Sequence, residues 1–102
     1  MSATSDLAKL EVNAAAIARI LKLFANEQRV RLLFHLEAAG NELPLVTIAA
    51  SLRIGQSALS QHLARLRKSG VIAARRDGHN LFYRIADSKA AALVIALKGS
   101  KT

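Results

Sequence analysis

The hydrophobic pattern of this chain changes period at Gly70, and that change limits the folds that the chain can adopt. Before Gly70, residues 56–69 place Leu59, Leu63 and Leu66 on one face of a helix. After it, "VIAARR" and "NLFYRI" alternate with a period of two on either side of "DG", a strong sequence signal for a β-hairpin. The sequence therefore predicts a helix followed directly by a two-stranded ribbon.

A second, shorter helix is expected just before residues 56–69. Pro44 biases Leu43 toward extended backbone angles, so "NELPL" is expected to be a short extended connection. Residues 46–52 then form a helix, and "RIG" at residues 53–55 is the link. Two short helices joined by about three residues, one of them glycine, make a helix-turn-helix. With the hairpin added, the expected unit is a winged helix-turn-helix.

Three more helices complete the expected fold. Residues 6–24 repeat apolar side chains every three or four positions, which predicts a helix with Ser5 as its N-cap. Residues 27–39 predict a second helix, with Asn26 as its N-cap. The last helix is almost wholly apolar, starts after Asp87 or Ser88, and ends at Gly99. We expect a mainly α fold of five helices with a small β-hairpin, forming a single domain over residues 1–102.

The apolar content exceeds what so short a chain can bury alone. With 102 residues, of which 52% are hydrophobic, a folded chain removes only about two-thirds of its surface from water. Cysteine is absent, so neither disulfides nor thiolate metal clusters can supplement the core. A last helix that is apolar around its circumference also has to be covered on all sides. A homodimer is therefore expected.

Positive charge is concentrated in one segment. Residues 53–84 hold seven basic residues against the single acid Asp77, which places +6 of the chain's net charge of +8 there. A localised basic face indicates a polyanionic partner, and double-stranded DNA fits a helix-turn-helix. The basic residues are Arg53, Arg65, Arg67, Lys68, Arg75, Arg76 and Arg84.

The helix of residues 56–69 has a polar face opposite its leucines. Glutamine and serine on this face suit close approach to base edges in a major groove, while Arg65 and Lys68 fall nearer to phosphates. The face carries no acid, and its members are Ser57, Ser60, Gln61, Ala64 and Lys68, with Arg65 at one edge.

The hairpin offers a second contact with DNA. Arg76, His79 and Asn80 at or near its tip are expected to enter an adjacent minor groove or to bracket the backbone. A two-residue loop of Asp77 and Gly78 would leave one face of the ribbon apolar, and a four-residue loop would shift the register. That apolar face consists of Ile72, Ala74, Leu81, Tyr83 and Ile85.

Other functions have weak support. The seven acids are scattered, no nucleophilic cysteine exists, and no glycine-rich phosphate loop is present, so catalysis is not expected. His62 is expected to pack or cap, His35 to lie at the surface and His79 at the wing, so no metal or cofactor is predicted.

No apolar run approaches about 20 residues and the N-terminus does not read as a secretory signal, so a cytoplasmic, nucleoid-associated protein without membrane contact is expected.

Three segments resemble the ArsR/SmtB-type winged-helix repressors of bacteria: "LFANEQRVRLLFHL", "LVTIAASLRIGQSALSQHLARLRKSGVI" and "RRDGHNLFYRI". The resemblance covers nearly the whole chain, and it implies an inducible promoter repressor with residues 56–69 as the recognition helix. By match to the family motif, the main DNA contacts would be Gln56, Ser57, Ser60 and Gln61. The resemblance also implies a homodimer built from the first and last helices, which would use Leu7, Leu10, Ala14, Ile17, Leu21, Leu93, Val94 and Leu97.

"IGQSALSQHL" and "FYRIADSKAAALVIAL" look closest to the BigR-like, sulfur-responsive branch of that family, which senses through two cysteines. Here Phe34 and approximately Thr102 occupy the cysteine positions, so dithiol sensing is chemically impossible. Gly55 also stands where many relatives have a serine N-cap. Two alternatives stay open: a repressor with an unknown organic effector in a pocket near Phe34, and a nucleoid-type protein that binds DNA by charge alone.

Overall fold

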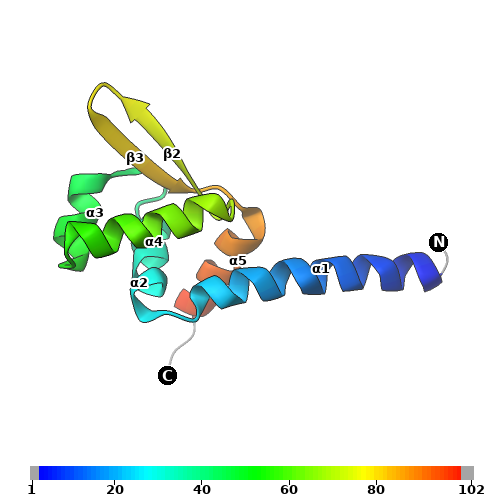
Figure 1. Ribbon diagram of the computed structural model, residues 1–102. Coiled ribbons are helices and arrows are strands. Elements are labelled where there is room, and N and C mark those ends of the chain that lie inside the picture. Colours follow the sequence, from blue (N-terminus) through cyan, green and yellow to red (C-terminus); the bar gives the residue numbers. More distant parts are fainter. Residues whose placement is uncertain (1–2, 100–102) are drawn as a thin grey trace.

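The computed structural model describes residues 3–99, and it describes side chains for residue 11 and residues 13–99. The element order is α1 (Ala3–Phe24), α2 (Glu27–Ala38), β1 (Leu43–Pro44), α3 (Leu45–Leu52), α4 (Gln56–Lys68), β2 (Ile72–Asp77), β3 (Asn80–Ile85) and α5 (Ser88–Lys98). Figure 1 shows α2 to α5 gathered beneath the β2–β3 ribbon, while α1 extends away from them. The expected five helices and the winged helix-turn-helix are thus confirmed.

Side-chain capping sets two of the helix starts as the sequence predicts. The Asn26 side chain accepts a hydrogen bond from the backbone N–H of Arg29 at 3.1 Å, and Asp87 accepts one from Ala90 at 2.9 Å. Each satisfies a backbone donor that the first helical turn leaves unpaired. The prediction for α1 is wrong in detail, because this helix already runs from Ala3 and therefore contains Ser5 instead of being capped by it.

The sheet has one strand more than predicted. β1 pairs antiparallel with β3, which gives the strand order β1-β3-β2. The extended connection before α3 is therefore confirmed, and it also serves as an edge strand. Pro44 is tolerated there because an edge strand can forgo one backbone donor. This pairing attaches the ribbon to the segment that leads into the helix-turn-helix.

The hairpin loop lies one residue later than the predicted Asp77 and Gly78. Asp77 pairs with Asn80 and Arg76 with Leu81, so the loop consists of Gly78 and His79. Gly78 has φ +64°, and glycine at the first loop position is the pattern of a type II′ turn. The pairing shifts by two positions relative to the prediction, and because strands have a period of two, the predicted apolar face is preserved.

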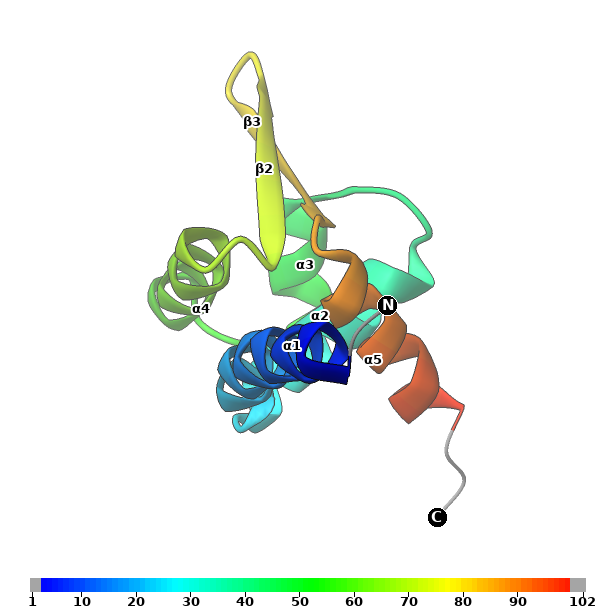
Figure 2. The same ribbon diagram turned by 90° about the vertical axis from the view of Figure 1, so that its right-hand side faces the viewer.

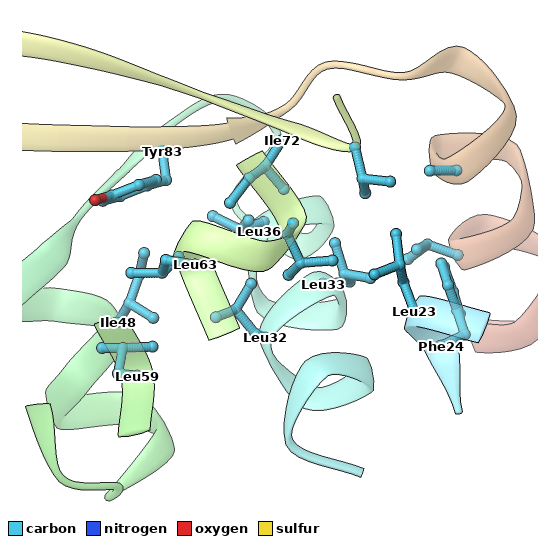
Figure 3. Close-up of a cluster of buried hydrophobic side chains, with 14 of the residues drawn as sticks. Leu23, Phe24, Leu32, Leu33, Leu36, Ile48, Leu59, Leu63, Ile72 and Tyr83 are labelled. Atoms are coloured by element: carbon cyan, nitrogen blue, oxygen red, sulfur yellow. The ribbon is translucent and has the colours of Figure 1, made fainter. Parts of the chain in front are cut away.

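The core lies where α2, α3, α4 and the inner face of the ribbon meet. Figure 3 shows Leu32, Leu33 and Leu36 of α2 between side chains of the other elements, with Tyr83 reaching in from β3. Each of these three leucines is at most 1% exposed, so a large part of the apolar surface leaves water here. The core also includes Ile48, Leu52, Leu59, Leu63, Leu66, Val71, Ile72, Ala90 and Val94.

Among the side chains of α1 that the structure describes, those at its C-terminal end join this core. Ile20, Leu23 and Phe24 are buried, whereas Ile17 and Leu21 keep 42% and 47% of their surface exposed. Figure 1 shows the rest of α1 projecting beyond the other elements. The radius of gyration is 15.4 Å, compared with about 13 Å for a compact chain of this length. None of the helices described is long and apolar enough to span a bilayer.

Candidate nucleic-acid interface

The recognition surface is the outer face of α4. Leu59, Leu63 and Leu66 are at most 2% exposed and anchor the helix in the core. Figure 2 shows α4 at the edge of the molecule, away from α5. All six side chains predicted to contact DNA from this helix are exposed: Gln56, Ser57, Ser60, Gln61, Arg65 and Lys68.

Hydrogen bonds at its two ends hold α4 in place. Arg31 donates from its Nη2 atom to the carbonyl oxygen of Leu52 at 2.9 Å, which ties α2 to the turn before α4. The second Arg31 nitrogen donates to Gln28 Oε1 at 2.6 Å and fixes the guanidinium. At the other end the Ser69 hydroxyl donates to the Leu66 carbonyl at 2.8 Å. The N-cap is Gly55, which provides no side-chain bond, as its chemistry dictates.

The wing residues lie at the outer end of the hairpin. Arg76, His79 and Asn80 are all exposed, and Asn80 belongs to the last pair of the ribbon while His79 lies in the loop. Figure 1 shows that the β2–β3 ribbon rises on the same side of the molecule as α3 and α4. The geometry therefore presents a helix face and a hairpin tip as two separate polar surfaces.

One wing arginine has an intramolecular role that the sequence analysis missed. Arg75 donates from Nε to both carboxylate oxygens of Glu42, at 3.1 and 3.2 Å, and a further bond joins Arg75 Nη2 to Glu42 Oε1. Its guanidinium also lies 4.7 Å from the ring centroid of Phe82, the residue that it faces across the ribbon. We call this group the wing clamp. It fastens β2 to the residue before β1.

The wing clamp reduces the number of unpaired positive charges that a ligand can meet on this segment. The Arg75 hydrogen bonds lower the pKa of the Glu42 carboxyl, and those bonds raise the pKa of Arg75, so both groups are held in their charged forms. Among the described residues, Arg75 is the single basic residue of segment 53–84 with an ion pair; the remaining six are exposed. No sequence signal links these partners, because 33 positions separate them.

His62 lies on α4 at the margin of the core. Burial lowers its pKa, and the positive charges of Arg29 and Arg65 lower it further. Arg29 is itself only 8% exposed, and its Nε donates to the Leu23 carbonyl at 2.7 Å, where α1 ends. The His62 side chain is half-buried, which agrees with its predicted place at the edge of the leucine face. His35 is exposed, as predicted. Among the side chains that the structure describes, no three or more of His, Cys, Asp or Glu lie together as a metal site would require.

A separate apolar surface runs along α1 and α5. A groove of about 330 Å³ is lined by Ile17, Ile20, Lys89, Ala92 and Leu93. Also on α5, Ile95 and Leu97 are 57% and 44% exposed.

Burial within the chain bears on the residues predicted for a dimer contact. Val94 is fully buried within its own chain, so it cannot meet a partner. Ile95 is exposed instead and was not predicted. The side chains of Leu7 and Leu10, like residue Thr102, lie outside what the structure describes.

Sequence and structure comparisons identify relatives of the whole fold. Residues 26–74 match the model of the "Bacterial regulatory protein, arsR family". The chain is 36% identical over 92 residues to the transcriptional activator HlyU of Vibrio cholerae, an alignment that covers 90% of this chain and 83% of the relative. It is 38% identical over 91 residues to the biofilm growth-associated repressor of Agrobacterium fabrum, covering 89% and 76%. The chain belongs to the arsR family.

Solved structures of arsR-family regulators superpose on this fold. The transcriptional repressor BigR from Xylella fastidiosa gives a TM-score of 0.80 at 33% identity, covering 92% of this chain and 96% of that one. HlyU from Vibrio vulnificus gives 0.81 at 34% identity, covering 91% and 95%. The matched family and relatives are DNA-binding transcriptional regulators and not enzymes, which confirms the class of function predicted from sequence.

Neutral His62 makes stability depend on pH. Because the folded-state pKa of His62 lies below the ordinary histidine value of about 6.5, the unfolded chain binds the proton more readily. The stabilisation is complete above the unfolded pKa and is lost as pH falls through 6.5 toward the folded pKa. We expect His62→Gln to flatten the change in urea midpoint between about pH 7.5 and 5.5. His35→Gln, at an exposed position, is the control, and an undiminished pH dependence in His62→Gln would contradict the assignment.

The wing clamp predicts a local effect on the ribbon. Glu42→Gln removes the charged partner of Arg75, so amide hydrogens of β2 and β3 should exchange a few-fold faster while those of α2 keep their rates. Asp77→Asn is the matched control, because it removes an acid whose Oδ2 lies 4.0 Å from Arg75 and whose side chain is 74% exposed. Equal exchange rates in both variants would show that the clamp does not hold the wing.

Proposed function

We propose that the protein is a homodimeric, sequence-specific transcriptional repressor that binds an imperfect palindrome. Each recognition helix α4 would enter one of two successive major grooves, about 34–36 Å apart. The observation that carries this proposal is the acid-free, exposed face of α4, held outward by the burial of Leu59, Leu63 and Leu66 on its opposite side.

The polar groups of this surface divide into base readers and phosphate contacts. Gln56, Ser57, Ser60 and Gln61 supply amide and hydroxyl groups of the kind that pair with base edges. Arg65 and Lys68, further along the helix, bind phosphates and fix its position. In the wing, Arg76, His79 and Asn80 contact the adjacent minor groove or its backbone.

The dimer in this proposal forms through α1 and α5. Regulators of this family typically act as dimers. In this chain, four large aliphatic side chains on α1 and α5 are exposed, one of them in the lining of the α1–α5 groove, and isolated domains seldom leave large apolar patches in water. Those side chains are Ile17, Leu21, Ile95 and Leu97.

Control by an inducer would not use thiols in this protein. Residues 1–102 contain no cysteine, which supports regulation without two-cysteine sulfur sensing or thiolate metal binding. Our proposal treats residues 1–102 as one DNA-binding domain without a resident cofactor. An organic effector near Phe34, which packs half-buried against the core, is the alternative form of regulation; a ligand-dependent rise in melting temperature would identify it.

Selection of bound duplexes from a random DNA pool, at low and moderate salt, tests the proposal. Enrichment of one palindromic motif that persists at moderate salt is the expected result. Binding without an enriched motif, lost when salt is added, would instead show a nucleoid-type protein that binds by charge alone.

The base-reading role of Gln61 can be separated from charge. A well-placed contact between an amide side chain and a base favours the correct base over a wrong one by about 1–3 kcal/mol. Gln61→Ala should therefore lower the ratio of specific to nonspecific affinity by about tenfold or more. Arg65→Ala is the contrasting variant, since loss of a phosphate contact weakens both DNAs and lowers the salt dependence. Fluorescence anisotropy with the selected duplex and a scrambled one measures both. An equal loss on the two duplexes for Gln61→Ala would remove it from the base readers.

The interface is tested by charge insertion. Ile17→Glu places a carboxylate in the α1–α5 groove, and we expect the dimer dissociation constant to rise by at least about tenfold because the charge must be desolvated there. Val46→Glu is the control, since Val46 is a 67% exposed aliphatic residue on α3, outside the groove. Sedimentation equilibrium measures the constant. A dimer unchanged by Ile17→Glu would place the interface elsewhere.

A further inference from the structure

The turn between α3 and α4 holds an arginine in a strained conformation. Arg53 has φ 57° and ψ 41°, the left-handed region that L-residues with a Cβ atom avoid. Within residues 3–99 the other positive φ values all belong to glycines, at Gly40, Gly70 and Gly78. Arg53 is therefore the one described position where the fold accepts this cost with a long side chain.

The backbone at this position does not require arginine. The Arg53 N–H donates to the Ala49 carbonyl at 3.0 Å, which completes the end of α3. Glycine would make that bond equally well and would adopt the left-handed angles without a steric cost. The neighbouring carbonyl of Leu52 is held by Arg31 at 2.9 Å, so the turn is fixed by groups other than the Arg53 side chain.

The side chain itself has no polar partner within the part of the chain that the structure describes. Arg53 is exposed, and among the residues described its guanidinium takes part in no hydrogen bond or ion pair. Residues held in sparsely populated backbone conformations cluster at functional sites. The planar guanidinium of arginine carries a positive charge and five N–H donors, and this geometry suits an oxyanion, above all a phosphate.

The position of Arg53 identifies the source of that phosphate. It lies three residues before Gln56, at the end of α4 where the proposed base readers begin. We propose that Arg53 binds a backbone phosphate of double-stranded DNA at the edge of the groove that α4 enters. This inference rests on the proposed function. The contact fixes the depth and orientation of α4 without reading sequence.

Two substitutions separate the charge from the strain. Arg53→Gln removes the cation and keeps a Cβ atom, whereas Arg53→Gly removes both. Arg19→Gln is the matched control, because Arg19 is also exposed, without an ion pair among the described residues, and lies on α1 outside the recognition surface. Each variant is measured by thermal unfolding and by affinity for a selected duplex and a scrambled duplex over a range of salt concentrations.

The expected results differ among the variants. Both Arg53 variants should bind the two duplexes several-fold more weakly, and the slope of log K against log salt should become shallower by about 0.9 for each protomer. Arg53→Gly should also melt at a higher temperature than the wild type, because it relieves the strain. Arg19→Gln should leave the slope unchanged.

Three outcomes would overturn the inference. If the wild type binds a selected motif but neither Arg53 variant changes the slope, the inference fails and the proposed function stands. If Arg53→Gly melts at a lower temperature, the side chain serves the fold instead of a ligand. If the wild type binds no duplex at all, the proposed function fails, and the role of Arg53 fails with it.

Discussion

The burial of three leucines on one face of α4 is the constraint on which the rest of this structure depends. Leu59, Leu63 and Leu66 rotate the helix so that its glutamines and serines point outward. The core that receives them is assembled from α2, α3 and the inner side of the ribbon, so the same contacts orient the wing relative to α4. Packing energy and ligand recognition are thus properties of opposite faces of one helix.

Arginine serves two different purposes in this small basic protein. Arg29, Arg31 and Arg75 direct their donors to a carbonyl, an amide or a carboxylate within the chain, and they hold α1, the helix-turn-helix and the wing in place. The arginines of α4 and the hairpin tip have no such partners among the described residues and are directed to solvent. Net charge alone does not distinguish these groups, since each contributes equally to the total of +8.

Local patterns were sufficient to predict most elements and not sufficient to predict long-range pairs. The 3.6-residue period of the leucines, the caps Asn26 and Asp87 and the change of period at Gly70 each depend on neighbours in sequence, and the structure contains all of them. The third strand and the wing clamp join residues more than thirty positions apart, for which the sequence carries no local signal. The hairpin loop was misplaced because "DG" and "GH" both suit a two-residue turn, and pairing along the whole ribbon decides between them.

Val94 illustrates the same limit on the opposite side of the molecule. A helix that is apolar all around gives no sequence signal for which side faces its own core, and the fold buries Val94 while leaving Ile95 exposed. Only the packing of α5 against α2 and the ribbon resolves that choice.

The wing clamp has a consequence for the thermodynamics of recognition. By joining β2 to the residue before β1, it adds a further restraint to a hairpin that the β1–β3 pairing already attaches to the domain. The ribbon then loses its conformational entropy when the chain folds, and it loses little more when a ligand binds. A binding surface preorganised in this way can convert weak individual contacts into useful affinity, which suits a chain with few residues to devote to its ligand.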